Sequence, residues 1–241
     1  PMYGSLRKFL VERMAGKYTP SWHTLAKGEL TGCELFVDSH GMAENMLAGD
    51  YDNFFINHLK KINLTGKVVF DIGAHIGFDT LFFAKAVGEK GKVFAFEPNI
   101  ANKKRLDLIV ARNKNFSNRI KTYAVAISNK KGKEEFIFTD KVDQGTSSGS
   151  FIEGAHTLWE KSIYEKEVGF KRTMAETISL DEILDIGITD APLLIKIDVE
   201  GAEYLVIEGA KNLIRKCRPI LFIEIHSIFN MLMVGEDLKE L

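Results

Sequence analysis

Cysteine is scarce in this sequence, and long apolar runs and an excess of one charge sign are absent. The two cysteines, Cys33 and Cys217, lack the spacing of metal ligands, which argues against a disulfide framework or a zinc site. No run of about 18 apolar residues predicts a membrane span. The start of the sequence lacks the order of basic, apolar and small residues that marks a signal peptide. A reducing, cytoplasmic location fits this pattern best.

The near balance of charge limits the choice of partners. The formal net charge is -1, which argues against bulk attraction to nucleic acid, and no DNA partner is expected. Residues 103–133 are locally basic. We interpret them as a solvated helix face and loop, because charge runs usually face water. Binding of RNA, which this stretch would serve, is the less favoured alternative.

From about residue 66, short β-rich runs alternate with helical patterns, which predicts an α/β fold with a mostly parallel sheet covered by helices. Strands are expected at KVVFDIG, KVFAFEP, IKTYAVAI, PLLIKIDV and PILFIEIH. A helix should follow the first strand and end at Gly88, and another should begin after the cap residue Asn99. The segment GAEYLVIEGAKNLIRK predicts a single helix after the fourth strand.

Two regions depart from this alternation. Residues 1–65 predict a small, mainly helical extension, with one strand at ELFVD and a helix at YDNFFINHLKKI. Residues 66–241 form the main domain. Within it, EEFIFT predicts an extra strand, and a Gly/Ser-rich loop insertion follows around residues 140–165. The segment SLDE, residues 179–182, has the spacing of a capping box and predicts a short helix.

The segment DIGAHIG, residues 71–77, follows the first strand at the point where open α/β sheets bind ligands. Gly73 permits a tight turn or positive φ, and Gly77 lets a helix N-terminus approach the ligand. The spacing lacks the G-x-G-x-x-G that brings backbone up to a pyrophosphate. Asp71 adds negative charge there, so a ligand with a positive group is favoured.

Glu97 ends the next strand, about twenty residues past the glycine loop. Such a carboxylate can accept both hydroxyls of a ribose. Ala126 and Ile127, at the end of the third strand, are apolar enough to flank an adenine ring. His75 either touches the cofactor's carboxylate or fills space. A ribose-bearing ligand with a cationic part and no pyrophosphate describes S-adenosylmethionine.

Polar residues alternate with apolar ones in LLIKIDVEGAE and LFIEIHS. In adjacent parallel strands, Lys196 would lie beside Glu224, and Asp198 beside His226. Pairing with Glu224 would offset the cost of burying Lys196. Asp198 would fix the imidazole tautomer and raise its proton affinity, which makes His226 a candidate general base with a starting pKa of about 6.5.

Other functions of these residues stay open. His226 could merely cap a strand or bond a neighbouring loop. Asp198 could bind a divalent cation with Glu200, Glu203 or Glu224, because hard ions take clustered carboxylates. The metal-free alternative is favoured, so no metal ligand is assigned.

Taken together, these residues resemble the FkbM-type, class I S-adenosylmethionine-dependent methyltransferases. The resemblance covers residues 66–226 through VVFDIGAHIGFDT, FAFEPN, ISLDEIL, LLIKIDVEGAEYLVIEGA and IEIH, in that order. It implies a Rossmann-like methyltransferase fold, a three-layer sandwich. Around the methionine part of the cofactor it implies Asp71, Gly73, Ala74, His75 and Gly77, with Glu97 on the ribose.

The resemblance also implies a reaction. Family members typically methylate hydroxyls of sugars, glycolipids or polyketide-like products, so a small-molecule or glycan acceptor is expected. Asp198 falls where donor and acceptor meet, and His226 would remove the proton as the bond forms. The alternatives are a non-catalytic cofactor-binding module, an RNA methyltransferase and a nucleotide-dependent oxidoreductase. The two last strands of the class are expected to be missing, and the bare sheet edge would favour a homodimer.

Overall fold

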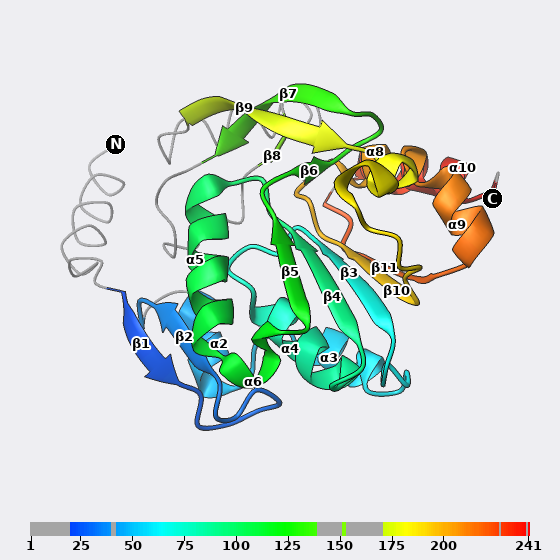
Figure 1. Ribbon diagram of the computed structural model, residues 1–241. Helices are drawn as coiled ribbons and strands as arrows, with labels where there is room; N and C mark the ends of the chain where they lie inside the picture. The colour runs from blue at the N-terminus through cyan, green and yellow to red at the C-terminus, as the bar shows by residue number, and fades with distance from the viewer. Residues whose placement is uncertain (1–19, 40–41, 139–150, 153–170, 227, 240) are drawn as a thin grey trace.

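The computed structural model describes residues 20–39, 42–138, 151–152, 171–226, 228–239 and 241. At its centre is a five-stranded parallel sheet of order β11-β10-β3-β4-β5 (Figure 1). Its strands are β3 (Val68–Ile72), β4 (Lys92–Phe96), β5 (Ile120–Tyr123), β10 (Leu194–Ile197) and β11 (Ile220–Ile223). The strand order reverses between β3 and β10, which places the expected ligand site beyond their carboxyl ends. The predicted Rossmann-like sheet is confirmed.

Side chains of successive sheet residues enter two different hydrophobic cores, as the period of two requires. Val69 and Leu194 belong to the core beneath α4 (Phe78–Val87) and α5 (Ile100–Arg112). Phe70 and Ile195 belong to the opposite core. That core is closed by η2 (Leu180–Ile186), α8 (Glu203–Glu208), α9 (Lys211–Cys217) and α10 (Ile228–Lys239). Helices therefore cover both faces, and the three-layer sandwich is confirmed.

The described part of the N-terminal segment contains a β-hairpin as well as helices. Strands β1 (Ser21–Thr24) and β2 (Glu34–Val37) pair antiparallel, and α2 (Met42–Ala48) and α3 (Asn53–Leu59) follow. The strand at ELFVD and the helix near residue 55 are therefore as predicted, whereas β1 was not expected. Apolar side chains of this segment pack into the core beneath α4, so it shares that core with the main sheet.

A second, four-stranded sheet of order β6-β9-β7-β8 lies across the top of the molecule in Figure 1. It contains β6 (Ala126–Ile127), β7 (Gly132–Phe138), β8 (Phe151–Ile152) and β9 (Lys171–Ile178). The extra strand predicted at EEFIFT is β7. The third expected strand is divided, because β5 stays in the central sheet and β6 pairs with β9. Most of the predicted insertion, residues 140–165, lies outside the described residues.

The helix caps follow the sequence signals. The Asn99 side chain accepts a hydrogen bond from the Ala101 N–H, Ser179 and Glu182 form a capping box, and α4 ends at Gly88. The single helix expected after β10 is wrong, since it breaks at Gly209 into α8 and α9. A Cβ on Gly209 would lie 2.3 Å from the Ser128 carbonyl oxygen, so the close approach of this loop needs glycine.

Strand β11 forms an edge of the central sheet. Among the described residues it has a neighbouring strand on one side alone. The proposed dimer stays a prediction. None of the described helices combines the length and apolar character needed to cross a membrane.

Candidate active site

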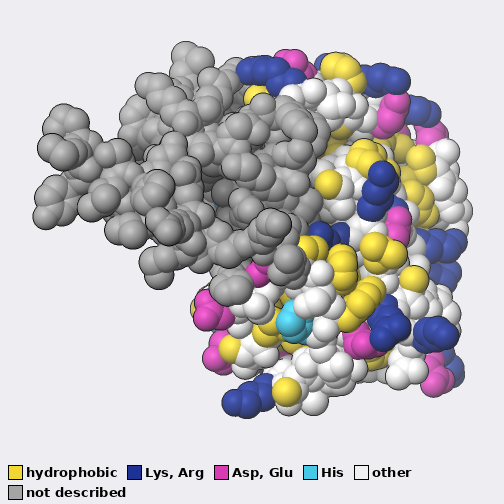
Figure 2. Space-filling model, turned by 90° about the vertical axis from the view of Figure 1, so that its left-hand side faces the viewer, with side chains coloured by type: hydrophobic (Ala, Val, Ile, Leu, Met, Phe, Trp, Pro, Cys, Tyr) yellow, Lys and Arg dark blue, Asp and Glu magenta, His cyan; other side chains and the backbone are white. Residues whose placement is uncertain are grey.

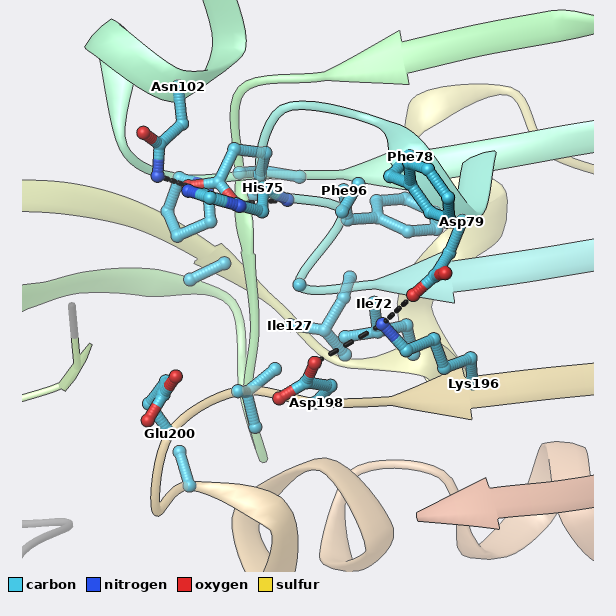
Figure 3. A pocket seen from close by; sticks show the side chains of 18 of the residues that line it. Ile72, His75, Phe78, Asp79, Phe96, Asn102, Ile127, Lys196, Asp198 and Glu200 are labelled. Atoms are coloured by element: carbon cyan, nitrogen blue, oxygen red, sulfur yellow. Dashed lines mark hydrogen bonds and ion pairs between the residues drawn. The ribbon is translucent and has the colours of Figure 1, made fainter. Parts of the chain in front are cut away.

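A pocket opens at the carboxyl ends of β3, β4 and β10 (Figure 3). Six of the predicted cofactor residues line it: Gly73, Ala74, His75, Glu97, Ala126 and Asp198. Ile127 lines it too, whereas Asp71 and Gly77 do not. The glycine loop, the end of β4 and the end of β10 therefore meet at one site, as the sequence predicted.

The two glycines of the loop serve different contacts. Gly73 has φ of 83°, and a Cβ there would lie 1.7 Å from the Asp198 carbonyl oxygen. Only glycine lets the loop lie this close to the end of β10. Gly77 has φ of 94°, and its Cβ would meet Leu106 Cδ1 at 2.4 Å. Gly77 therefore serves the packing of α4 against α5 beneath the pocket.

Asp71 is fully buried behind the loop rather than in the pocket wall. The Thr80 hydroxyl donates to its Oδ2 at 2.5 Å, and its Oδ1 has no hydrogen-bond partner among the described residues. Burial raises the pKa of Asp71 to about 6, against the lowering effect of Lys196. Asp71 pairs with Lys196 in the register of β3 and β10, and its negative charge stabilises the Lys196 ammonium, which lines the pocket.

Glu97 is buried, and its carboxylate is held by the loops around it. The backbone N–H groups of His75 and Asn99 donate to its two oxygens at 2.8 Å, and Asn102 Nδ2 lies 3.5 Å from Oε1. Burial raises the pKa of Glu97 to about 7, although these donors lower it. A carboxylate offers about four acceptor positions, so Glu97 retains capacity for a ribose hydroxyl.

His75 adopts φ of 51°, which is rare for a residue with a side chain, and it lines the pocket. Burial lowers the pKa of His75 to about 4, so the imidazole is neutral at pH 7. It can donate a hydrogen bond to a ligand but adds no positive charge.

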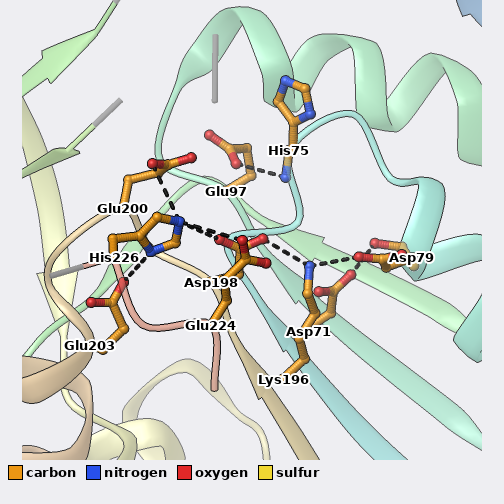
Figure 4. Close-up of polar contacts among 11 residues, drawn as sticks. Asp71, His75, Asp79, Glu97, Lys196, Asp198, Glu200, Glu203, Glu224 and His226 are labelled. Atoms are coloured by element: carbon orange, nitrogen blue, oxygen red, sulfur yellow. Dashed lines mark hydrogen bonds and ion pairs between the residues drawn. The ribbon is translucent and has the colours of Figure 1, made fainter. Parts of the chain in front are cut away.

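The predicted pairing of Lys196 with Glu224 is wrong. In the observed register Lys196 lies opposite Phe222, and the Glu224 N–H donates to the Ile197 carbonyl at 2.9 Å. In this register residues 194–197, which are apolar apart from Lys196, pair with the apolar residues 220–223. The observed pairing differs from the predicted one by two residues. Lys196 Nζ instead contacts Asp79 Oδ2 at 2.6 Å and an oxygen of Asp198 at 3.2 Å (Figure 4).

The electrostatic balance keeps Lys196 charged. Burial opposes the charge, but the carboxylates of Asp79, Asp198 and Asp71 outweigh it and raise the pKa of the ammonium. Lys196 is therefore a fixed cation of the pocket wall and not a base.

His226 stands among four carboxylates just outside the pocket lining (Figure 4). Its Nδ1 lies 3.0 Å from Glu203 Oε1, and Glu203 is fully buried. Its Nε2 lies 3.6 Å from Asp198 Oδ1, 3.5 Å from Glu200 Oε2 and 3.8 Å from Glu224 Oε1. The structure thus brings Asp198 and His226 together, although they are not neighbours in the strand register.

The pKa values of His226 and of its neighbour Glu200 are both raised. Burial opposes protonation of the imidazole, but the bond to Glu203 and the charges of Glu200, Glu203 and Asp198 raise its pKa to about 9. Burial and the neighbouring acids raise the pKa of Glu200 to about 8, against the lowering effect of His226. Groups coupled in this way titrate as a set. Glu200 also has φ of 54°, a strained conformation of the kind found at functional sites.

The model of the Methyltransferase FkbM domain matches residues 71–236. The chain belongs to the FkbM methyltransferase family.

The chain is also similar to two known proteins. Hexuronic acid methyltransferase AglP from Haloferax volcanii is 27% identical over 160 residues, which are 66% of this chain and 56% of that protein. The chain therefore spans about half the length of this relative. The crystal structure of Methyltransferase FkbM from Methylobacillus flagellatus KT is similar with a TM-score of 0.50 and 21% identity. It covers 74% of this chain and 38% of that one, and it supports the fold alone.

Three residues of this FkbM chain also have the geometry of a cation site. Asp198, Glu224 and His226 each offer one ligand atom, and the three atoms lie within 4.8 Å of one another. Carboxylate oxygens and imidazole nitrogen are ligands for divalent ions. The metal alternative therefore stays open, with His226 as a ligand instead of a base.

Several of the lining residues were not predicted from the sequence. Tyr51, Asp79, Asn102 and Phe136 come from the N-terminal segment, the first turns of α4 and α5, and β7. Asp79 and Asn102 could have been suspected, because each follows a predicted strand end by one short loop. Nothing in the sequence around Tyr51 or Phe136 indicates a ligand.

Several basic residues of the stretch 103–133 pair with acids. Lys103 contacts Asp107 at 2.6 Å, and Arg112 contacts Glu34 at 2.7 Å. Lys131 and Lys133 likewise contact acidic residues. On the face shown in Figure 2, the described Lys and Arg side chains are interspersed with acidic and hydrophobic ones. These pairs support the interpretation of a solvated surface.

Proposed function

We propose that this chain transfers the methyl group of S-adenosylmethionine to a hydroxyl of a sugar or glycan-like acceptor. The observation that carries the proposal is one pocket with Glu97 at one end and Asp198, backed by His226, at another. Membership in the FkbM family supports the methyl donor. The hexuronic acid in the name of the AglP relative supports a sugar acceptor.

The lining residues fit the cofactor. Glu97 has acceptor capacity left for ribose, and Ala126 and Ile127 offer apolar surface for adenine. Asp79 keeps a buried carboxylate oxygen without a partner among the described residues, which suits a cationic group. Bound S-adenosylmethionine supplies the methyl group as an electrophile on a sulfonium.

The acceptor hydroxyl has to lie in line with that methyl group, which is largely a positioning problem. We assign the general base to His226, whose Nδ1 is fixed by Glu203 so that Nε2 faces Asp198. The imidazole first loses its own proton and then takes the hydroxyl proton as the carbon–oxygen bond forms and the carbon–sulfur bond breaks. Asp198 and Glu200 stabilise the imidazolium that results.

An acceptor screen tests the proposal. The purified chain is incubated with methyl-labelled S-adenosylmethionine and separate hexuronic acids, neutral sugars or RNA. Label should appear on a sugar and should be lost in Asp198→Asn. It should persist in Glu89→Gln, a matched change at an exposed acid. Transfer to RNA alone would replace the acceptor class, and no transfer by protein that binds the cofactor would favour the non-catalytic module.

A further inference from the structure

A buried ion pair joins two elements at one end of the pocket. Asp79 lies in the first turn of α4 and Lys196 in β10, and their side chains are 8% and 9% exposed. Both line the pocket. Figure 3 shows them at one end, with Asn102 and His75 at the other. The position suggests contact with one end of an elongated ligand.

The hydrogen-bonding capacity of this pair is not exhausted. Asp79 Oδ2 accepts from Lys196, but the buried Oδ1 has no partner among the described residues. The Lys196 ammonium has three N–H donors, and Asp79 and Asp198 accept two of them. Among the described residues one oxygen of Asp79 and one N–H of Lys196 therefore lack a hydrogen-bond partner, although the Phe55 ring centroid lies 5.9 Å from Lys196 Nζ. Leaving such groups unpaired in a protein interior destabilises the fold.

Negative charges also outnumber positive charges around the pair. Asp71, Asp79 and Asp198 all act on the single ammonium of Lys196. A ligand that brings positive charge to the carboxylates and a small negative group to the lysine would satisfy both requirements. The amino-acid end of S-adenosylmethionine is such a group, because its ammonium and carboxylate sit on the same carbon and the sulfonium follows.

We infer that Asp79 and Lys196 bind the amino-acid end of the cofactor, an inference that rests on the function proposed above. Asp79 Oδ1 accepts from the ammonium, and the third N–H of Lys196 donates to the carboxylate. Glu97, at the other end, holds the ribose. The pair thus selects ligands that carry a free amino-acid group over nucleosides that lack one.

Two ligands separate this function from a purely structural one. S-adenosylhomocysteine carries the amino-acid end, whereas 5′-methylthioadenosine has the same adenine and ribose without it. Calorimetry measures Kd for both with wild type, Lys196→Met and the double variant Asp79→Asn/Lys196→Met. The control is Lys121→Met, at an exposed lysine of β5. Both test variants should bind S-adenosylhomocysteine about 10- to 100-fold more weakly and 5′-methylthioadenosine within about threefold of wild type.

The affinities for the two ligands decide whether the pair binds the amino-acid end. Equal losses for the two ligands, or no loss for S-adenosylhomocysteine, would overturn the inference. The double variant removes both charges and so leaves no unpaired buried ion from the pair, and retained binding of 5′-methylthioadenosine shows an intact pocket. Glu97→Ala should show the contrasting pattern and weaken both ligands. Failure of the wild type to bind S-adenosylhomocysteine would overturn the proposed function together with this inference.

Discussion

Several exposed charges of this protein form one-to-one pairs, whereas acids outnumber cations at the pocket. On the surface, Arg112 meets Glu34 and Lys131 meets Asp185. Beside the pocket, four carboxylates surround His226 and three act on Lys196. Surface pairs contribute about 0–1 kcal/mol, while excess buried charge destabilises a fold. The comparison agrees with our proposal that the acids at the pocket serve binding and chemistry rather than stability.

The largest effect is expected from removing the imidazole. His226→Asn should lower methyl transfer at least about 100-fold, the usual contribution of a general base. Affinity for S-adenosylhomocysteine should change less than about threefold, because His226 does not line the pocket. The control is His58→Asn, whose ring bonds a backbone carbonyl of its own helix. Full activity in His226→Asn would remove this residue from the mechanism.

The acids around His226 also predict the pH dependence. Only the neutral imidazole can take a proton, and its pKa is raised to about 9. The value of kcat/KM should therefore rise with pH from 7, about tenfold per unit at first, and level off above about 9. Initial rates between pH 6.5 and 10 measure this. A profile that is already flat at pH 7 would contradict the assignment.

Metal removal distinguishes the two functions of the acid cluster. With His226 as base, dialysis against a chelator should leave the rate within about twofold, and Glu224→Gln should have a small effect because that side chain is 63% exposed. Loss of activity that returns with Mg²⁺ or Mn²⁺, together with inactivity of Glu224→Gln, would make Asp198, Glu224 and His226 cation ligands instead.

The smallest effect is expected at the surface. Glu34→Gln breaks the pair with Arg112 and should lower the free energy of unfolding by less than about 1 kcal/mol, with no change in methyl transfer. Urea unfolding and an activity assay measure both quantities. A larger loss would show that this surface ion pair contributes more to the free energy of unfolding than surface pairs usually do.

Much of the fold could be predicted because its signals are local. Strand periodicity and the caps at Asn99 and Ser179 act over a few residues, and the structure has them as predicted. The break at Gly209 and the crossing of β6 into the second sheet depend on contacts with distant backbone. Sequence periodicity carries no information about such contacts.

The site residues likewise divide into those that local signals predicted and those that depend on distant contacts. The glycine loop, Glu97 and Asp198 were found because strand ends of a parallel sheet converge. The partner of Lys196 was missed because Asp79 lies 117 residues away, on a helix rather than on the neighbouring strand. A shift of two residues in register preserves the apolar pattern, so periodicity alone cannot choose between the alternatives.

We have proposed that the pocket holds S-adenosylmethionine with its ribose on Glu97. Calorimetric titration with S-adenosylhomocysteine and with NAD, on wild type, Glu97→Ala and the surface control Glu89→Ala, tests it most directly. We expect S-adenosylhomocysteine to bind wild type and the control alike, about 10- to 100-fold more weakly to Glu97→Ala, and NAD not to bind. Binding of NAD, or a folded wild type that does not bind S-adenosylhomocysteine, would contradict the account.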